Sequence, residues 1–174
     1  MISIEITKES RRTVERTLQN FMNHGKLAKA IIFATRRAAV TARKAGTQEI
    51  RKIYNVKAGT LKAAASLQTE TMGTTIRIKG PEEPVTTYKA TKQRKGIFVA
   101  IKKGSGSVVP RSFDMPGRGY SARRGAARYP VKKLFGPAIP QLFGNQAVVD
   151  VMTDKGMEMY EKRLMHELER MAGE

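Results

Sequence analysis

Two kinds of hydrophobic pattern organise the first part of the chain. Residues 2–6 alternate isoleucine with polar residues, which predicts a short half-buried strand. From about residue 10 until Gly46, apolar residues recur every three or four positions, as on one face of an amphipathic helix whose other face is rich in Lys and Arg. Gly25 predicts a kink or break in this helix. Shorter helical patterns follow at 47–54 and 58–65.

The middle of the chain has the pattern of short strands separated by turns. The expected strands are 72–79, 85–88, 97–101 and 108–109. The prolines around Glu82 and Glu83 predict a solvated turn, and the glycines of 102–107 predict a hairpin turn. We expect strand 97–101 to share a sheet with residues 128–131.

Residues 102–128 are rich in Gly, Ser and Arg and have no periodicity. A connection of this length inside a small domain is usually a functional loop or a segment that becomes ordered on binding. The sequence therefore predicts an extended basic loop over 102–128.

The last element is predicted as a long helix over 141–172, with Pro140 in its first turn. Its apolar stripe contains Gly156, which favours close approach of another helix. The expected fold class is α+β: a small, mostly antiparallel sheet packed by a long N-terminal and a long C-terminal helix. Residues 1–174 are expected to form a single domain.

Composition adds a strong charge to this picture. The chain has 33 Lys and Arg against 15 Asp and Glu, a formal net charge of +18. Such a charge favours a polyanionic partner, whether nucleic acid, an anionic membrane or an acidic protein surface. Residues 145–174 are acidic instead, with seven acids and four bases, so copies of the chain could stack head to tail.

Several classes of protein are disfavoured. The absence of cysteine excludes disulfide scaffolds and thiolate metal sites. The N-terminus lacks the features of a signal peptide, and the longest apolar run, about 30–34, is far shorter than the roughly 20 residues of a membrane helix. His24 and His166 have no partners at metal-binding or catalytic spacing. We therefore expect no catalytic residue, no metal, no cofactor and no membrane.

The clearest candidate site is cationic. Between Lys89 and Lys133 there are thirteen Lys or Arg and one acid, Asp114. Arginine and glycine together, as in 117–128, contact nucleic acid through charge and guanidinium stacking. The candidate contacts with DNA or an acidic partner are Lys102, Lys103, Arg111, Arg118, Arg123, Arg124, Arg128, Lys132 and Lys133.

The stretch RYPVKKLFGPAIPQLFGN, residues 128–145, connects this region to the last helix. Its prolines fix local backbone angles, and its Leu, Ile and Phe side chains supply apolar anchors, so it is predicted to be a rigid structural elbow. We call residues 128–145 the elbow.

The elbow resembles the hallmark of the prophage minor tail protein Z family, in which a Tyr-Pro strand end leads through a Gly-Pro-x-x-Pro-Gln turn into the terminal helix. The resemblance is sharpest over residues 95–172. The matching residues are Tyr129, Pro130, Gly136, Pro137, Pro140, Gln141 and Leu142.

The resemblance implies a tail-completion protein of a tailed phage, assembled in the bacterial host cytoplasm and located in the virion at the tail–head junction. It implies a homo-oligomeric ring of six copies, next to the tail terminator protein and the head-closure or connector proteins. Genomic DNA passes through this joint. The resemblance implies no enzymatic activity.

A different function also fits the residues. A nucleic-acid-binding protein without sequence specificity would use the arginine-rich segment itself as its site. A hydrolase or nuclease fits poorly, because the clustered Asp, Glu or His that such chemistry requires are missing.

Overall fold

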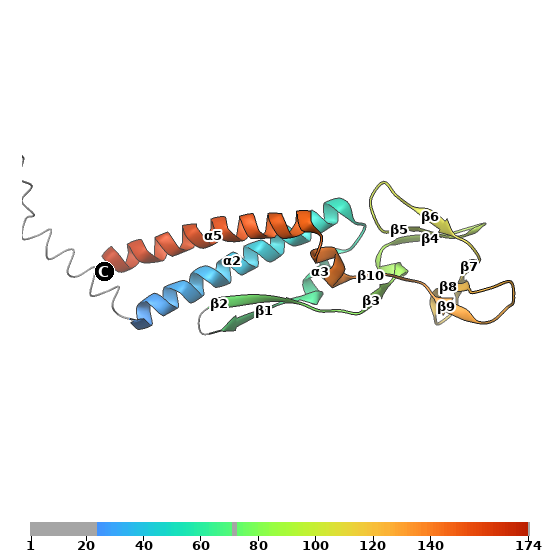
Figure 1. Ribbon diagram of the computed structural model, residues 1–174, viewed down its shortest axis with the longest axis horizontal. Coiled ribbons are helices and arrows are strands. Elements are labelled where there is room, and N and C mark those ends of the chain that lie inside the picture. Colours follow the sequence, from blue (N-terminus) through green and yellow to red (C-terminus); the bar gives the residue numbers. More distant parts are fainter. Residues whose placement is uncertain (1–23, 71–72, 174) are drawn as a thin grey trace, which may run out of the picture.

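The computed structural model describes residues 24–70 and 73–173 and shows an elongated α+β protein (Figure 1). Helices α2 (His24–Ile53) and α5 (Gln146–Gly173) lie side by side and antiparallel at one end of the molecule. Small antiparallel sheets flank them and form the other end. The predicted fold class is therefore confirmed. The strand expected at residues 2–6 lies outside the described residues.

Helix α2 continues through Gly46, so the predicted end of the helix at this residue is wrong, and residues 47–53 belong to the same helix. Helix α5 passes so close to α2 at this position that there is no room for a side chain larger than that of glycine. A Cβ added at Gly46 would overlap the side chain of Met152, and one added at Gly156 would lie 3.3 Å from the Cβ of Ala42. Small residues thus allow the two helix backbones to approach closely, as Gly156 indicated.

A short helix and a β-hairpin cover another side of α2. Helix α3 (Ala58–Ala64) confirms the third helical pattern, and β2 (Gly73–Ile78) confirms the strand predicted over 72–79. Its partner β1 (Ala65–Glu70) was not predicted, because four of its six residues are polar and exposed. The guanidinium of Arg43 on α2 donates a hydrogen bond of 3.1 Å to the carbonyl of Ala65 and so ties the hairpin to the helix.

The segment 82–88 differs from its prediction. Glu82 and Glu83 lie in a short strand, β3 (Glu82–Pro84), which pairs with β10 (Phe135–Ala138). The expected strand 85–88 is instead a 3₁₀ turn, η1 (Val85–Thr87). Val85 is buried there, so the apolar residue reflects core packing and not strand pairing.

The next sheet has the order β4-β5-β6, built from β4 (Lys89–Gln93), β5 (Gly96–Ala100) and β6 (Ser107–Val109). Strands β5 and β6 confirm the patterns at 97–101 and 108–109. The turn between them confirms the hairpin predicted over 102–107.

A separate sheet follows, with the order β7-β8-β9. It contains β7 (Ser112–Met115), β8 (Gly119–Arg123) and β9 (Val131–Lys133). The extended loop expected over 102–128 is therefore wrong: most of this segment is two antiparallel hairpins. Segment 128–131 also does not share a sheet with strand 97–101, because β9 pairs with β8. We call residues 89–133, which hold β4 to β9, the β lobe.

The single helix predicted over 141–172 is two helices. Helix α4 (Ile139–Phe143) ends at Gly144, and α5 begins at Gln146. Pro140 does lie in the first turn of α4, as expected. Ile139, Leu142 and Phe143 are buried in the main core together with residues of α2, α3 and α5. None of the described helices is long and apolar enough to cross a membrane.

Candidate functional site

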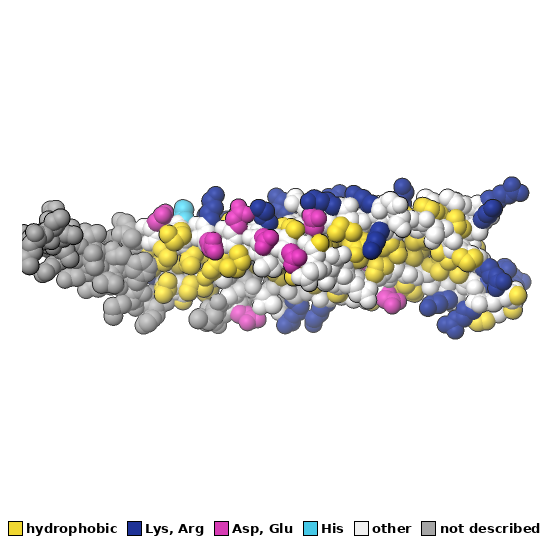
Figure 2. Space-filling view, turned by 45° about the horizontal axis from the view of Figure 1, so that its top comes forward, with side chains coloured by type: hydrophobic (Ala, Val, Ile, Leu, Met, Phe, Trp, Pro, Cys, Tyr) yellow, Lys and Arg dark blue, Asp and Glu magenta, His cyan; other side chains and the backbone are white. Residues whose placement is uncertain are grey.

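The β lobe concentrates positive charge at one end of the molecule. Figure 2 shows Lys and Arg gathered at this end, and Asp and Glu mainly over the helices. All nine cations predicted as contacts are exposed. Among residues 24–70 and 73–173, no carboxylate forms a salt bridge with any of them. Their charge is thus available to an external partner.

The sheet β7-β8-β9 distributes these cations over two faces. Because Ser121 pairs with Lys133 and Arg123 pairs with Val131, Arg123 and Lys133 lie on the same face, and Lys132 lies on the opposite one. The guanidinium of Arg123 lies over the ring of Phe113, 5.6 Å from the ring centre, which is close enough for a cation–π contact.

The other predicted cations lie outside the strands, in the segments that connect them. Lys102 and Lys103 follow β5, and Arg118 lies between two glycines with positive φ, Gly117 and Gly119, at the β7–β8 turn. Arg124 and Arg128 lie in the loop 124–130, which a hydrogen bond of 3.2 Å from the Arg124 N–H to the Pro130 carbonyl closes. The structure therefore gives a broad cationic surface and not one convergent pocket.

One serine joins the two sheets of the β lobe. The Ser112 hydroxyl accepts a hydrogen bond of 2.7 Å from the Ile97 N–H and donates one of 2.6 Å to the Val109 carbonyl. Gly96 lies beside this link with a φ of +140°, and a Cβ there would lie 2.6 Å from the Val109 carbonyl oxygen. Neither residue was predicted to matter, since a lone Ser or Gly between strands gives no distinctive sequence signal.

Within the elbow, Gly136 and Pro137 pack on Tyr88. The Tyr88 hydroxyl donates a hydrogen bond of 2.5 Å to the Pro137 carbonyl, and a Cβ at Gly136 would lie 2.7 Å from the Tyr88 ring. Burial, and secondarily the negative charge of Glu83, raises the pKa of Tyr88 to about 12. Tyr88 therefore keeps its proton and donates this bond throughout the neutral range.

The rest of the elbow connects the β lobe to the helices. The Gln141 side chain accepts a hydrogen bond of 3.1 Å from the Ala138 N–H at the start of α4, and Leu142 is buried. Tyr129 and Pro130, joined by a cis peptide bond, lie instead on the surface. The predicted motif is thus divided: Gly136 to Leu142 form a structural junction, and Tyr129 with Pro130 is available for contact.

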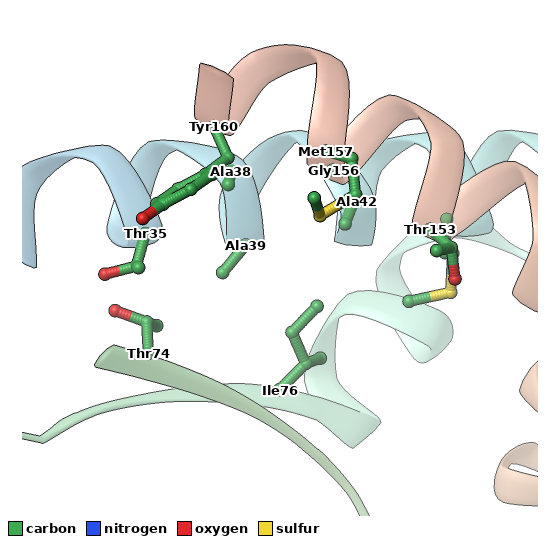
Figure 3. A pocket seen from close by; sticks show the side chains of 11 residues that line it. Thr35, Ala38, Ala39, Ala42, Thr74, Ile76, Thr153, Gly156, Met157 and Tyr160 are labelled. Carbon is green, nitrogen blue, oxygen red and sulfur yellow. The ribbon is translucent and has the colours of Figure 1, made fainter. Parts of the chain in front are cut away.

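A groove that the sequence did not predict lies between α2, α5 and β2 (Figure 3). Its volume is about 380 Å³. Ala38 and Ala39 of α2 form its floor, Ile76 of β2 lies on one side, and Met157 and Tyr160 of α5 lie on the other. The surface is mainly apolar, so it suits a hydrophobic group of a partner.

Within 24–70 and 73–173, no group of three or more His, Asp or Glu could hold a metal ion. His166 is exposed on α5, and Glu83 accepts a hydrogen bond of 3.0 Å from the Thr87 hydroxyl. No family model, curated protein or solved structure matches the chain.

Proposed function

We propose that this chain is a structural virion protein of a tailed bacteriophage. In this proposal it forms a ring at the head-proximal end of the tail and helps to join tail to head around the DNA channel. The observation that carries the proposal is the elbow, whose motif resembles that of the minor tail protein Z family. Its residues from Gly136 to Leu142 have specific packing and hydrogen-bonding roles at the junction of β lobe and helices.

The shape of the molecule suits an adaptor. A helical pair at one end and a cationic lobe at the other offer two different surfaces, which a protein between two neighbours in a joint requires. The exposed cations of the β lobe would face DNA in the channel or an acidic surface of a neighbouring ring. The mechanism is binding, and no step of chemistry is needed.

Assembly tests this proposal. The purified chain should form rings alone or with the tail terminator protein, or bind one end of purified tails, as seen by negative-stain imaging and mass photometry. A stable monomer that never joins tails, even with the terminator protein present, would overturn it.

The charge of the β lobe supports a second candidate, a nucleic-acid-binding protein without sequence specificity. A dedicated binder loses affinity steeply as salt rises, because each contacted phosphate releases counterions. Neutralising Arg123, Arg124 and Arg128 together should then reduce the salt slope of DNA binding by about three, measured by fluorescence anisotropy. Feeble DNA binding by a chain that still assembles would favour the adaptor.

A further inference from the structure

Carboxylates lie on α5 beside the groove between α2, α5 and β2. Asp150, Asp154, Met157 and Glu161 follow one another at spacings of four, three and four, so they form one stripe along α5. All four are exposed, and Met157 also lines the groove. An apolar groove with carboxylates on the adjoining surface of α5 suits a partner with an apolar group beside positive charges.

The same chain carries such a group at its other end. Tyr129 is 68% exposed, the highest value among the exposed large hydrophobic residues of the described chain. It lies in the loop 124–130, where Arg124 and Arg128 are also exposed. Tyrosine and arginine are residue types that frequently dominate the energy of interfaces when they fill a pocket.

These two surfaces lie apart within one molecule. The loop 124–130 joins β8 to β9 at the end of the β lobe, whereas the groove lies among the helices and β2 (Figures 1 and 3). They can therefore meet only between two copies. Such a contact joins unlike surfaces, which produces a ring where the rotation closes and a filament where it does not.

We propose that the loop 124–130 of one copy docks in the groove of the next copy. The ring of Tyr129 enters the groove, and Arg124 and Arg128 lie against Asp154 and Glu161 of the neighbour. This inference rests on the proposed function, because it names the surfaces by which the ring assembles.

Disulfide cross-linking tests the contact directly, since the chain has no cysteine of its own. Ala127→Cys places a thiol beside Tyr129, and Thr153→Cys places one at the groove; both positions are exposed. Mixing these two variants under mild oxidation should give a covalent dimer. The matched control mixes Ala127→Cys with Lys62→Cys, an exposed position on α3 away from the groove, and should give little dimer.

Charge reversal supplies an independent test. The double variant Asp154→Lys, Glu161→Lys and the double variant Arg124→Glu, Arg128→Glu should each associate at least about tenfold more weakly than the unmodified chain. A mixture of the two should associate again, because the intact loop of the first can dock in the intact groove of the second. Glu70→Lys, an exposed reversal on β1, serves as the control and should have little effect.

The outcomes separate the two proposals. If the chain forms rings but the cross-link does not exceed its control, or the mixture of reversed variants does not recover, this contact is wrong and the proposed function stands. If the chain stays monomeric both alone and with tails and terminator protein, both proposals are overturned. Circular dichroism of every variant identifies any loss caused by misfolding, and the cysteine pair then decides, because neither of its changes alters a charge.

Discussion

At the scale of single residues, Gly96 determines how the two sheets of the β lobe meet. Its φ of +140° is a conformation that residues with a side chain rarely adopt, and its backbone lies against the Val109 carbonyl. The Ser112 hydroxyl occupies the same place, where it joins both sheets. The space at this point therefore accepts no Cβ.

We expect Gly96→Ala to lower the free energy of unfolding by about 2–3 kcal/mol, from backbone strain and collision with the Val109 carbonyl. Urea unfolding followed by circular dichroism measures it. The matched control is Gly59→Ala in α3, where no atom lies within 4 Å of the added Cβ and stability should rise slightly. Equal effects at the two positions would contradict the prediction.

The contribution of Tyr88 to the stability of the folded chain depends on pH in the alkaline range. Below pH 10 the hydroxyl is protonated in both folded and unfolded chains, so its contribution to stability is constant. Between pH 10 and about 12 the unfolded chain ionises at the ordinary pKa while the folded chain keeps its proton, so this contribution is lost as pH rises.

Tyr88→Phe should therefore lower the free energy of unfolding by about 1–2 kcal/mol near pH 8, because the Pro137 carbonyl loses its hydrogen-bond donor. The difference in free energy of unfolding between this variant and the unmodified chain should become smaller as the pH approaches 12. Urea unfolding from pH 8 to pH 11.5 measures both effects. Tyr120→Phe in β8 removes a tyrosine hydroxyl other than the one bonded to Pro137, and a similar narrowing for this control would refute the assignment to Tyr88.

The sequence identified the motif residues of the elbow but not their partners. Pro137 and Leu142 stand out in a pattern of prolines and apolar residues, and both are parts of the junction. Tyr88 lies 49 positions from Pro137, so only the folded chain brings its hydroxyl to that carbonyl. Contacts of this separation leave no periodic signal in the sequence.

At the scale of elements, Asn145 separates α4 from α5. Its side-chain oxygen accepts a hydrogen bond of 3.1 Å from the Ala147 N–H, and its amide nitrogen donates one of 3.3 Å to the Tyr54 hydroxyl. This residue both begins α5 and connects it to the end of α2. It explains why the predicted continuous helix is divided here.

Asn145→Ala should lower the free energy of unfolding by about 1–2 kcal/mol, since it removes a helix cap and the partly buried hydrogen-bond partner of the Tyr54 hydroxyl. Thermal unfolding measures this loss. Gln146→Ala is the neighbouring control, because it removes only an exposed hydrogen bond to Asp150. If Gln146→Ala were as costly as Asn145→Ala, the capping role would be wrong.

Long, strongly periodic helices were predictable, whereas the short strands were predicted only in part: β5 and β6 were, but β7, β8 and β9 were not. The patterns of α2 and α5 extend over 30 and 28 residues, whereas β7, β8 and β9 have three to five residues each. In β8, a glycine and an arginine interrupt the alternation of apolar and polar residues that would indicate a strand. The groove was also unpredictable, because its floor and both sides come from three elements distant in sequence.

At the scale of the whole molecule, charge is separated along the long axis. The β lobe carries thirteen cations and one carboxylate, and the exposed stripe of α5 carries Asp150, Asp154 and Glu161. Association between these surfaces depends on electrostatic attraction that salt screens. The screening length falls from about 10 Å at 0.1 M salt to about 3 Å at 1 M.

Assemblies of the chain should accordingly weaken between 0.1 M and 1 M NaCl, as light scattering after size-exclusion chromatography can measure. Sucrose at matched osmolality is the uncharged control and should leave them intact. Assembly that strengthens with salt would show that apolar contact outweighs charge.

The uneven charge of this elongated molecule also affects how it arrives at a partner. A body with its cations at one end turns in the field of a polyanion while it is still approaching, so that end leads. Orientation is then selected during diffusion, before any side chain touches. A subunit that reaches its binding place already aligned needs few unproductive collisions. The arrangement of charge in the β lobe would thus increase the rate of assembly as well as its strength.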